Sequence, residues 1–377
     1  MHTHLLMPLA PLVLRTGKPF GETGGDDTFL FPLPSTVAGS LRAAHADSTL
    51  QDFRENRGQI LSWASHGALP AEIVGDSIHP LFPRPADAVY LSSDGETFLK
   101  RLSPADHGGN EGCDLDGLTP VFLDKDAPSK PKDGPAWWTE DAMERWLSGE
   151  TPDLAALGPM APPIDLRSHV ALEPSTLSAS TGKLFQSAGP DFESRRNKPV
   201  SDLTQRGWTK GRYGLLARFA NPVEPTLLRL GGEGRLAHVS QRDAWPQLPD
   251  SLRDALNTAT HIRMLMATPA LFTKGWRPGW LGDDLTGTVP GTSGLVLRLK
   301  AAAVDRWRAI SGWDMVARKP KAVRRMVPAG AVYWFEVVKP AANWADDLWL
   351  APISDAEHDR KDGFGLVLPG IWNRTPA

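Results

Sequence analysis

The chain has 377 residues, of which 41% are hydrophobic and 23% charged, and this length is enough for two globular domains with separate cores. Its single cysteine, Cys113, excludes a disulfide framework or a cysteine metal cluster and favours a reducing, cytoplasmic location. A net charge of −3 excludes a uniformly basic nucleic-acid clamp.

Residues 5–14 are predicted to form a first strand. Because this apolar stretch is broken by Pro8 and Pro11 and has no cationic leader, it is expected to be neither a signal peptide nor a membrane span, which needs about 20 apolar residues. The segment GKPFGETGGDDTFLFPLPSTVAGSLR (17–42) follows. Its glycines let backbone N–H groups approach a bound group, Lys18 adds a positive charge, and Phe20 offers a ring for stacking. Ser35 or Thr36 is expected to cap a helix from about Thr36 to Ala46. A glycine-rich loop before a helix predicts an anion site, with an ordinary surface loop as the alternative.

The stretch 67–163 is rich in proline, glycine and acidic residues, and residues 84–160 contain 7 Lys/Arg against 15 Asp/Glu. Its one clear helical pattern is Thr139–Leu147. We expect a long, mostly irregular insertion. Because its charge repels RNA, this insertion is expected to face protein or solvent.

Two later segments are basic: residues 183–242 contain 11 Lys/Arg against 5 Asp/Glu, and residues 298–327 contain 9 against 2. Strands are predicted at Ile164–Leu172 and Gly214–Phe219, with an extended hairpin or arm between them. Tryptophans lie among the cations, for example Trp208 and Trp313. Interleaved cations and flat rings are typical of single-stranded nucleic-acid binding, although a solvated basic face without a ligand is the alternative.

Two Gly-X-Gly turns, at 232–234 and 363–365, are each followed at once by a predicted strand. Neither has the strand-before, helix-after context of a dinucleotide fingerprint, so a Rossmann fold is rejected. Their repetition suggests two related α+β halves of a duplicated ferredoxin-like fold, with a boundary near Arg242–Asp250.

No coherent catalytic set is visible in the sequence. Gly24–Asp27 resembles the metal-binding motif of polymerases and cyclases but lies in a loop before a helix. Of ten scattered histidines, His45 is the best candidate for a general base, and a packed histidine at a helix end is the simpler interpretation. Cys113 lies among acidic residues and is a poor nucleophile. We therefore expect no catalysis, no metal and no cofactor.

Several long motifs, in order, resemble a known family, the third subunit of the Cmr complex, which is the type III-B CRISPR effector and belongs to the RAMP superfamily. The motifs are RTGKPF (15–20), FPLPSTVAGSLRAA (31–44), GKLFQS (182–187), LGGEGRLAHV (230–239), ATPALFTKGWRPGW (267–280), SGWDMVARKPKAVRRMVPAGAVYWFEV (311–337) and GFGLVLPGIW (363–372). Residues 67–160 match nothing in that family.

This resemblance implies two tandem ferredoxin-like (RRM-like) domains, residues 1–242 with the 67–163 insertion and residues 243–377. It implies a non-catalytic subunit that grips the repeat-derived 5′ handle of the guide RNA (crRNA) and docks on the large polymerase/cyclase-like subunit and on backbone subunits, with target RNA nearby and no membrane. The implied RNA-binding residues are Arg15, Gly17, Lys18, Phe20, Ser35, Thr36, Arg42, Lys183, Gly232, Gly234, Arg235, Lys274, Trp276, Arg277, Arg318, Lys319, Lys321, Arg324 and Arg325.

Two alternatives stay open at this point. The first is a guide-processing endoribonuclease of the same superfamily, which requires a histidine whose replacement abolishes cleavage. The second is a pure scaffold whose basic face binds acidic protein surfaces without contacting RNA.

Overall fold

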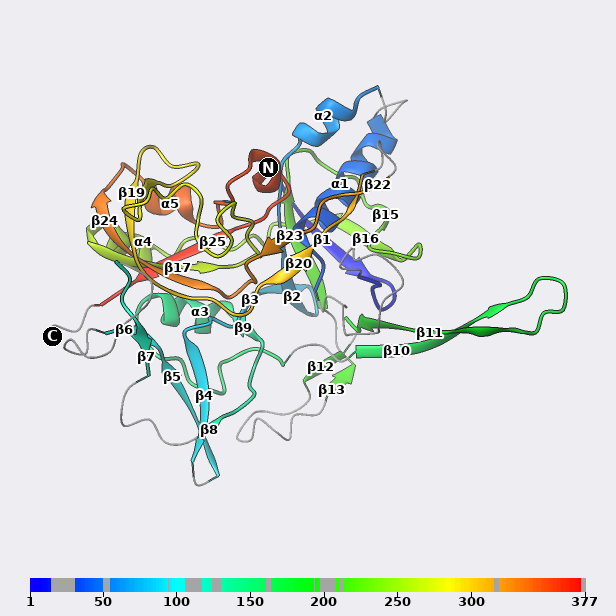
Figure 1. Cartoon of the computed structure of the whole chain (residues 1–377), viewed down its shortest axis with the longest axis horizontal. Helices are drawn as coiled ribbons and strands as arrows, with labels where there is room; N and C mark the ends of the chain where they lie inside the picture. The colour runs from blue at the N-terminus through cyan, green and yellow to red at the C-terminus, as the bar shows by residue number, and fades with distance from the viewer. Residues whose placement is uncertain are drawn as a thin grey trace.

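The computed structural model describes residues 1–14, 31–49, 55–93, 95–105, 117–123, 130–160, 164–192, 194–196, 208–210, 213–314 and 319–373 (Figure 1). It is a mixed α/β protein in which the strands pair antiparallel. The two largest sheets are built from different parts of the sequence, one before residue 242 and one after residue 260.

The larger sheet has seven strands in the order β15-β16-β1-β14-β2-β3-β9. Its strands are β1 (His2–Pro8), β2 (Ser65–Val74), β3 (Ser77–Pro83), β9 (Trp137–Thr139), β14 (Tyr213–Phe219), β15 (Thr226–Arg229) and β16 (Leu236–Gln241). The predicted first strand is therefore displaced toward the N-terminus, and it ends at Pro8, which has no N–H to donate to a ladder.

The second sheet has five strands in the order β18-β19-β24-β17-β25. They are β17 (His261–Met266), β18 (Thr286–Thr288), β19 (Val296–Ala303), β24 (Val332–Lys339) and β25 (Val367–Ile371). The strands predicted after the two Gly-X-Gly turns are confirmed as β16 and β25.

Smaller antiparallel pieces surround these sheets. They are β4 (Ala88–Ser93), β5 (Glu96–Arg101) and β8 (Lys130–Pro131); β6 (Ser103–Pro104) with β7 (Val121–Phe122); β10 (Ile164–Leu172) with β11 (Ala179–Pro190); β12 (Ser194–Arg196) with β13 (Trp208–Lys210); β20 (Arg308–Ile310) with β23 (Arg324–Met326); and β21 (Trp313–Asp314) with β22 (Lys319–Pro320). Figure 1 shows the β10–β11 hairpin extending away from the rest of the molecule, so the expected arm begins earlier than predicted, with Ile164–Leu172 as its first strand.

The helices described are α1 (Pro34–Thr49), α2 (Arg57–Ser62), α3 (Glu140–Leu147), α4 (Asp250–Thr258), α5 (Trp344–Leu348) and α6 (Glu357–Lys361). Helix α3 confirms the prediction at 139–147, and Thr139 caps it by accepting a hydrogen bond from the Ala142 N–H. Helix α1 begins earlier than predicted, because Pro34 occupies its first turn, where a missing N–H costs nothing. Ser35 and Thr36 therefore lie inside the first turn and do not cap the helix.

The prediction of a mostly irregular insertion at residues 67–163 is corrected, because this stretch contains several strands. Strand β2 lies between β14 and β3 in the large sheet, and it joins β3 through the two-residue turn Gly75–Asp76. Most of β2 is buried without alternation, so it lacks the period-two pattern that identifies a half-exposed strand. Strands β4, β5 and β8 form a further small sheet within the same stretch.

The core connects the two large sheets. One buried cluster joins Leu69 and Trp138 to Met264 and Phe335, so residues from both parts of the chain share it. Within it, the Arg263 guanidinium on β17 donates to the buried Asp87 carboxylate at 2.8 Å. Such a pair favours one docking of the second sheet against the segment just before β4, since any other arrangement leaves a buried charge unpaired.

Candidate nucleic-acid interface

Cations are concentrated on the basic hairpin, which we define as residues 304–327, of which 315–318 lie outside the described residues. Strands β20 and β23 pair at its base, with Ala309 opposite Arg325, and β21 and β22 pair farther out. The exposed cations that the structure describes on it are Arg306, Arg308, Lys319, Lys321, Arg324 and Arg325. Short strands at its base therefore present several positive charges from a narrow element.

A pocket of about 600 Å³ lies at the base of the basic hairpin, and we call it the Trp307 pocket. Its apolar walls include Leu118, Val121 and Val304, which means that part of the acidic stretch contributes to it. Its cationic and aromatic lining consists of Lys274, Trp276, Arg306, Trp307 and Arg325.

Trp307 is the exposed ring of this pocket, with half of its surface accessible. The Arg325 guanidinium carbon lies 5.1 Å from the centre of that ring, which is within the range of a cation–π contact. Within the described residues, neither Arg306 nor Arg325 has an acidic partner. A flat ring beside unpaired cations is suited to a nucleobase and its phosphate.

Lys274 and Arg277 approach the same region from the loop after β17. The Lys274 ammonium donates to the Leu281 carbonyl at 3.1 Å and lies 3.7 Å from the Asp283 carboxylate, and Arg277 lies 3.9 Å from that carboxylate. Asp283 is fully exposed, so solvent screens both ion pairs and both are weak. Either cation is therefore free to exchange Asp283 for a phosphate.

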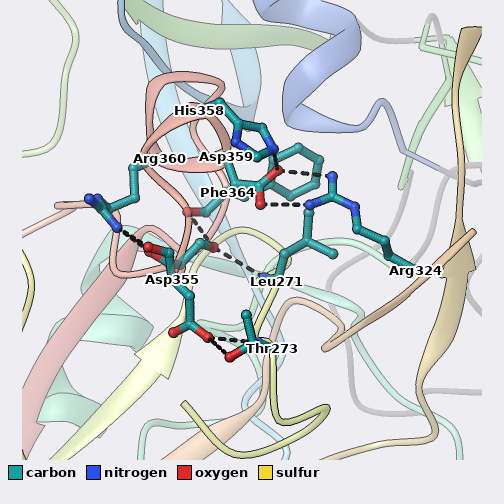
Figure 2. A network of polar contacts seen from close by, with 9 residues as sticks. Leu271, Thr273, Arg324, Asp355, His358, Asp359, Arg360 and Phe364 are labelled. Atoms are coloured by element: carbon teal, nitrogen blue, oxygen red, sulfur yellow. Dashed lines mark hydrogen bonds and ion pairs between the residues drawn. The ribbon is translucent and has the colours of Figure 1, made fainter. Parts of the chain in front are cut away.

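The loop bearing Lys274 is held by the Asp355 carboxylate. This group accepts hydrogen bonds from the Thr273 N–H at 2.7 Å and the Thr273 hydroxyl at 2.8 Å (Figure 2). It also accepts one from the Gly279 N–H at 2.9 Å. The loop is thus fixed at both ends of the predicted RNA-binding stretch Lys274–Arg277. Hydrogen bonds within the chain therefore position the loop, which reduces the ordering cost of binding.

Arg324 and Arg42 differ from the other predicted cations, because each is bonded to a carboxylate near α6. Arg324 forms a two-pronged contact with the buried Asp359 at 2.7 and 2.9 Å (Figure 2). Arg42 is buried, pairs with Asp362 and donates to the Trp63 carbonyl at 2.8 Å. The geometry gives both arginines a structural role: they anchor the α6 segment to the basic hairpin and to α1.

The Gly232–Gly234 turn lies elsewhere. The Gly232 N–H donates to the Val13 carbonyl at 2.8 Å, and Gly234 adopts φ 67° in open space. Arg235 follows, half-buried, and none of these residues lines the Trp307 pocket.

The second Gly-X-Gly turn, at 363–365, differs from the first, because Gly363 is buried and the Ser65 carbonyl lies only 2.8 Å from where a Cβ would stand. It therefore packs the sheets together and offers no exposed cradle.

The remaining predicted residues divide into two groups. Ser35 and Thr36 are half-buried in the first turn of α1, away from the Trp307 pocket. Those outside the described residues are Arg15, Gly17, Lys18, Phe20 and Arg318, together with the side chain of Lys183.

Arg306 and Trp307 are the residues that sequence reasoning missed. The signal was present in Asp-Arg-Trp-Arg (305–308), where a tryptophan stands between two arginines just after an apolar strand. The walls from 118–121 had no comparable signal, since they reach the pocket only through the tertiary fold.

The His45 ring is packed rather than poised for proton transfer. Its Nδ1 lies 2.9 Å from the Pro222 carbonyl, and the ring meets Trp63 edge-on at 4.8 Å. Among the described residues, no cluster of His, Cys, Asp and Glu is arranged to hold a metal ion. No helix in that part of the chain is long and apolar enough to cross a membrane.

Comparison with known protein families gives a match over nearly the whole chain. The model of the CRISPR-associated protein family Cas_Cmr3 matches residues 4–372. A search of curated proteins by sequence gives no match.

Solved structures give weaker similarities. Two structures of the type III-B Cmr-beta complex bound to cognate target RNA, one of them with AMPPnP, contain chains of 14% and 13% identity with TM-scores of 0.46 and 0.47. Each match covers 88% of this chain and 86% of the other. A chain of a type III-A Csm3–Csm4 subcomplex matches at 9% identity and TM-score 0.38, covering 90% of this chain and 96% of its own length.

Proposed function

This chain belongs to the Cas_Cmr3 family of CRISPR-associated proteins, and from that membership we propose that it is a non-catalytic guide-RNA-binding subunit of a type III-B effector complex. In this proposal it grips the 5′ handle of the guide RNA, docks on the large subunit and contacts backbone subunits. Fixing the handle sets the register of the guide for the rest of the assembly.

The observation that carries this proposal is the Trp307 pocket. Arg306 and Arg325 have no acidic partner among the described residues, and both stand beside an exposed ring. Phosphates of a single strand would be held by these arginines, while a splayed base stacks on Trp307. Lys274 is within reach of a neighbouring phosphate once it leaves Asp283.

The ferredoxin-like nature of the two halves is part of the same proposal. Four strands of the larger sheet, taken in chain order as β1, β2, β14 and β16, stand side by side in the order β16-β1-β14-β2. The strands β17, β19, β24 and β25 of the second sheet stand in the corresponding order β25-β17-β24-β19. The shared order supports two related domains, 1–242 and 243–377.

The test is RNA affinity as a function of salt in the reconstituted complex. Each phosphate contact to a single strand contributes about −0.7 to the slope of log K against log salt. Replacing Arg306 and Arg325 together with alanine should make the slope shallower by about 1.4. The control is Lys130→Ala, an exposed lysine on β8 outside the pocket. An unchanged slope in the double variant would remove the pocket from the RNA path.

The non-catalytic part of the proposal has its own test. Purified protein incubated with repeat RNA and a chelator should leave the RNA intact. Cleavage that disappears on replacing a histidine would instead identify a guide-processing endoribonuclease.

A further inference from the structure

We propose that the groove between α1 and β15 binds an extended segment of a partner protein, which adds a strand to the edge of the seven-stranded sheet. This goes beyond the proposed RNA-binding function, because the groove shares no residue with the Trp307 pocket. We call it the α1–β15 groove, and its volume is about 870 Å³.

The first observation is that β15 is an edge strand. It pairs with β16 from Thr226↔Val239 to Arg229↔Leu236, and no other described strand pairs with its far side. Backbone N–H and C=O groups on that far side are therefore open to a further strand. Natural proteins usually protect such an edge, and binding an extended peptide is one way of doing so.

The second observation is an apolar surface along this edge. Leu227 is 54% exposed on β15, and Leu236, on the neighbouring strand, is 38% exposed. Helix α1 contributes the small side chains of Ser40, Ala43 and Ala44 to the lining of the groove. Small residues on the helix leave room for the side chains of an added strand, which alternate between the helix and solvent.

The third observation is charge, and it selects a protein over an RNA. Asp47 and Glu224 are both exposed and both line the groove, while Arg229 is the only cation among the described residues of its lining. Two carboxylates beside an apolar surface repel a phosphate backbone. They favour a segment that carries apolar residues and at least one lysine or arginine near Asp47 and Glu224.

A strand fits better than a helix, because only an extended backbone satisfies the open groups of β15. A helix satisfies its own backbone and would leave those groups exposed or bury them unpaired. The main-chain ladder then supplies affinity, and the α1 wall supplies the choice of side chains.

The experiment compares amide hydrogen exchange of β15 in the isolated full chain and in the complex reconstituted from its purified subunits. We expect the amides of Leu227 and Arg229, whose N–H groups point away from β16, to exchange about tenfold or more slowly in the complex, because they become hydrogen-bonded. Equal exchange in the two states overturns the proposal. So does strong protection already present in the isolated chain, since the edge is then covered from within.

A steric variant tests the groove itself. Ala43 is exposed on α1, so Ala43→Trp fills the groove without entering the core, and Ala43→Ser is the matched control. The tryptophan variant should abolish the added protection of β15 while RNA crosslinking at the basic hairpin stays unchanged. Protection of β15 that survives the tryptophan places its partner elsewhere and overturns the proposal. Loss of RNA crosslinking in the unsubstituted complex would count against the proposed function alone.

Discussion

The basic hairpin and the α1–β15 groove are both open surfaces formed beside short strands, yet they differ in charge. The hairpin combines exposed arginines with Trp307, whereas the groove combines exposed leucines with two carboxylates. Both offer apolar area, so apolar area alone does not distinguish their partners. Charge does, because a phosphate backbone is attracted by the first surface and repelled by the second. In the two proposals, a protein with a net charge of −3 therefore binds RNA at one surface and protein at another.

A second contrast lies within the basic hairpin, between the neighbours Arg324 and Arg325. Successive side chains of a strand point to opposite sides. Arg324 consequently meets the buried Asp359, and Arg325 reaches Trp307. One arginine fastens the hairpin to α6, and its neighbour is left for a ligand.

The largest expected effect is on stability, and it tests the contrast between Arg324 and Arg325. Arg324→Ala leaves the buried Asp359 carboxylate without its strongest partner and should lower the free energy of unfolding by about 3 kcal/mol. Arg325→Ala should change it by less than about 0.5 kcal/mol, because Arg325 is exposed and makes no ion pair in the described part of the chain. Urea unfolding of both variants measures the difference. Equal losses of stability would show that Arg324 is not an anchor.

Acid should destabilise the protein through a histidine that bonds to the lining of the α1–β15 groove. Burial lowers the pKa of His4 to about 4, and its ring Nε2 accepts a hydrogen bond from the Val223 N–H at 3.0 Å. The unfolded chain, with a pKa of 6.5, binds this proton first. Stability is therefore fully present above pH 6.5 and falls as the pH drops toward 4, by up to about 3 kcal/mol.

Replacing His4 tests that expectation. Val223 lines the α1–β15 groove, so protonation of His4 removes a hydrogen bond next to it. His4→Gln keeps an acceptor without a titrating proton and should flatten the loss between pH 6.5 and 4 in thermal unfolding. The same pH dependence in the variant would assign the loss to other groups. One such group is His66, whose pKa burial also lowers to about 4.

Sequence reasoning located strands and helices where the pattern was local. Strand β10 was predicted with its observed bounds, and helix α3 was predicted at Thr139–Leu147, where the structure shows that Thr139 is its cap. Strand β2 was missed because it is buried on both faces, and a strand of this kind shows no alternation. Local patterns indicate half-exposed elements, while fully buried ones need the tertiary fold.

The candidate site divides in the same way. The sequence indicated where cations are concentrated, because 9 Lys/Arg stand in residues 298–327. It did not distinguish Arg42 and Arg324, which are bonded to carboxylates, from Arg325. Asp362 and Asp359 are 320 and 35 residues away from their arginines in the chain. Whether a cation is neutralised therefore depends on contacts that composition does not reveal.

The next effect concerns the ring of the Trp307 pocket. Trp307→Ala should weaken handle RNA binding by about 1–3 kcal/mol, which is the usual contribution of one stacked base, without changing the salt slope. Trp307→Phe should restore part of the affinity because it keeps a flat ring. Titration of labelled RNA into the reconstituted complex measures both variants. The comparison of the two surfaces fails if Trp307→Ala binds RNA normally but no longer assembles with protein subunits.

The smallest effect concerns the competition between Asp283 and phosphate. Asp283 lies within 4 Å of both Lys274 and Arg277, and it is fully exposed. Asp283→Asn removes this competitor and should raise RNA affinity about twofold at low salt, an amount in line with weak surface ion pairs. The control is Asp76→Asn in the β2–β3 turn, which changes the net charge equally away from the pocket. Because surface charges are screened, the gain should vanish at high salt. An equal gain in both variants would mean that overall charge, rather than release of Lys274 and Arg277, controls binding.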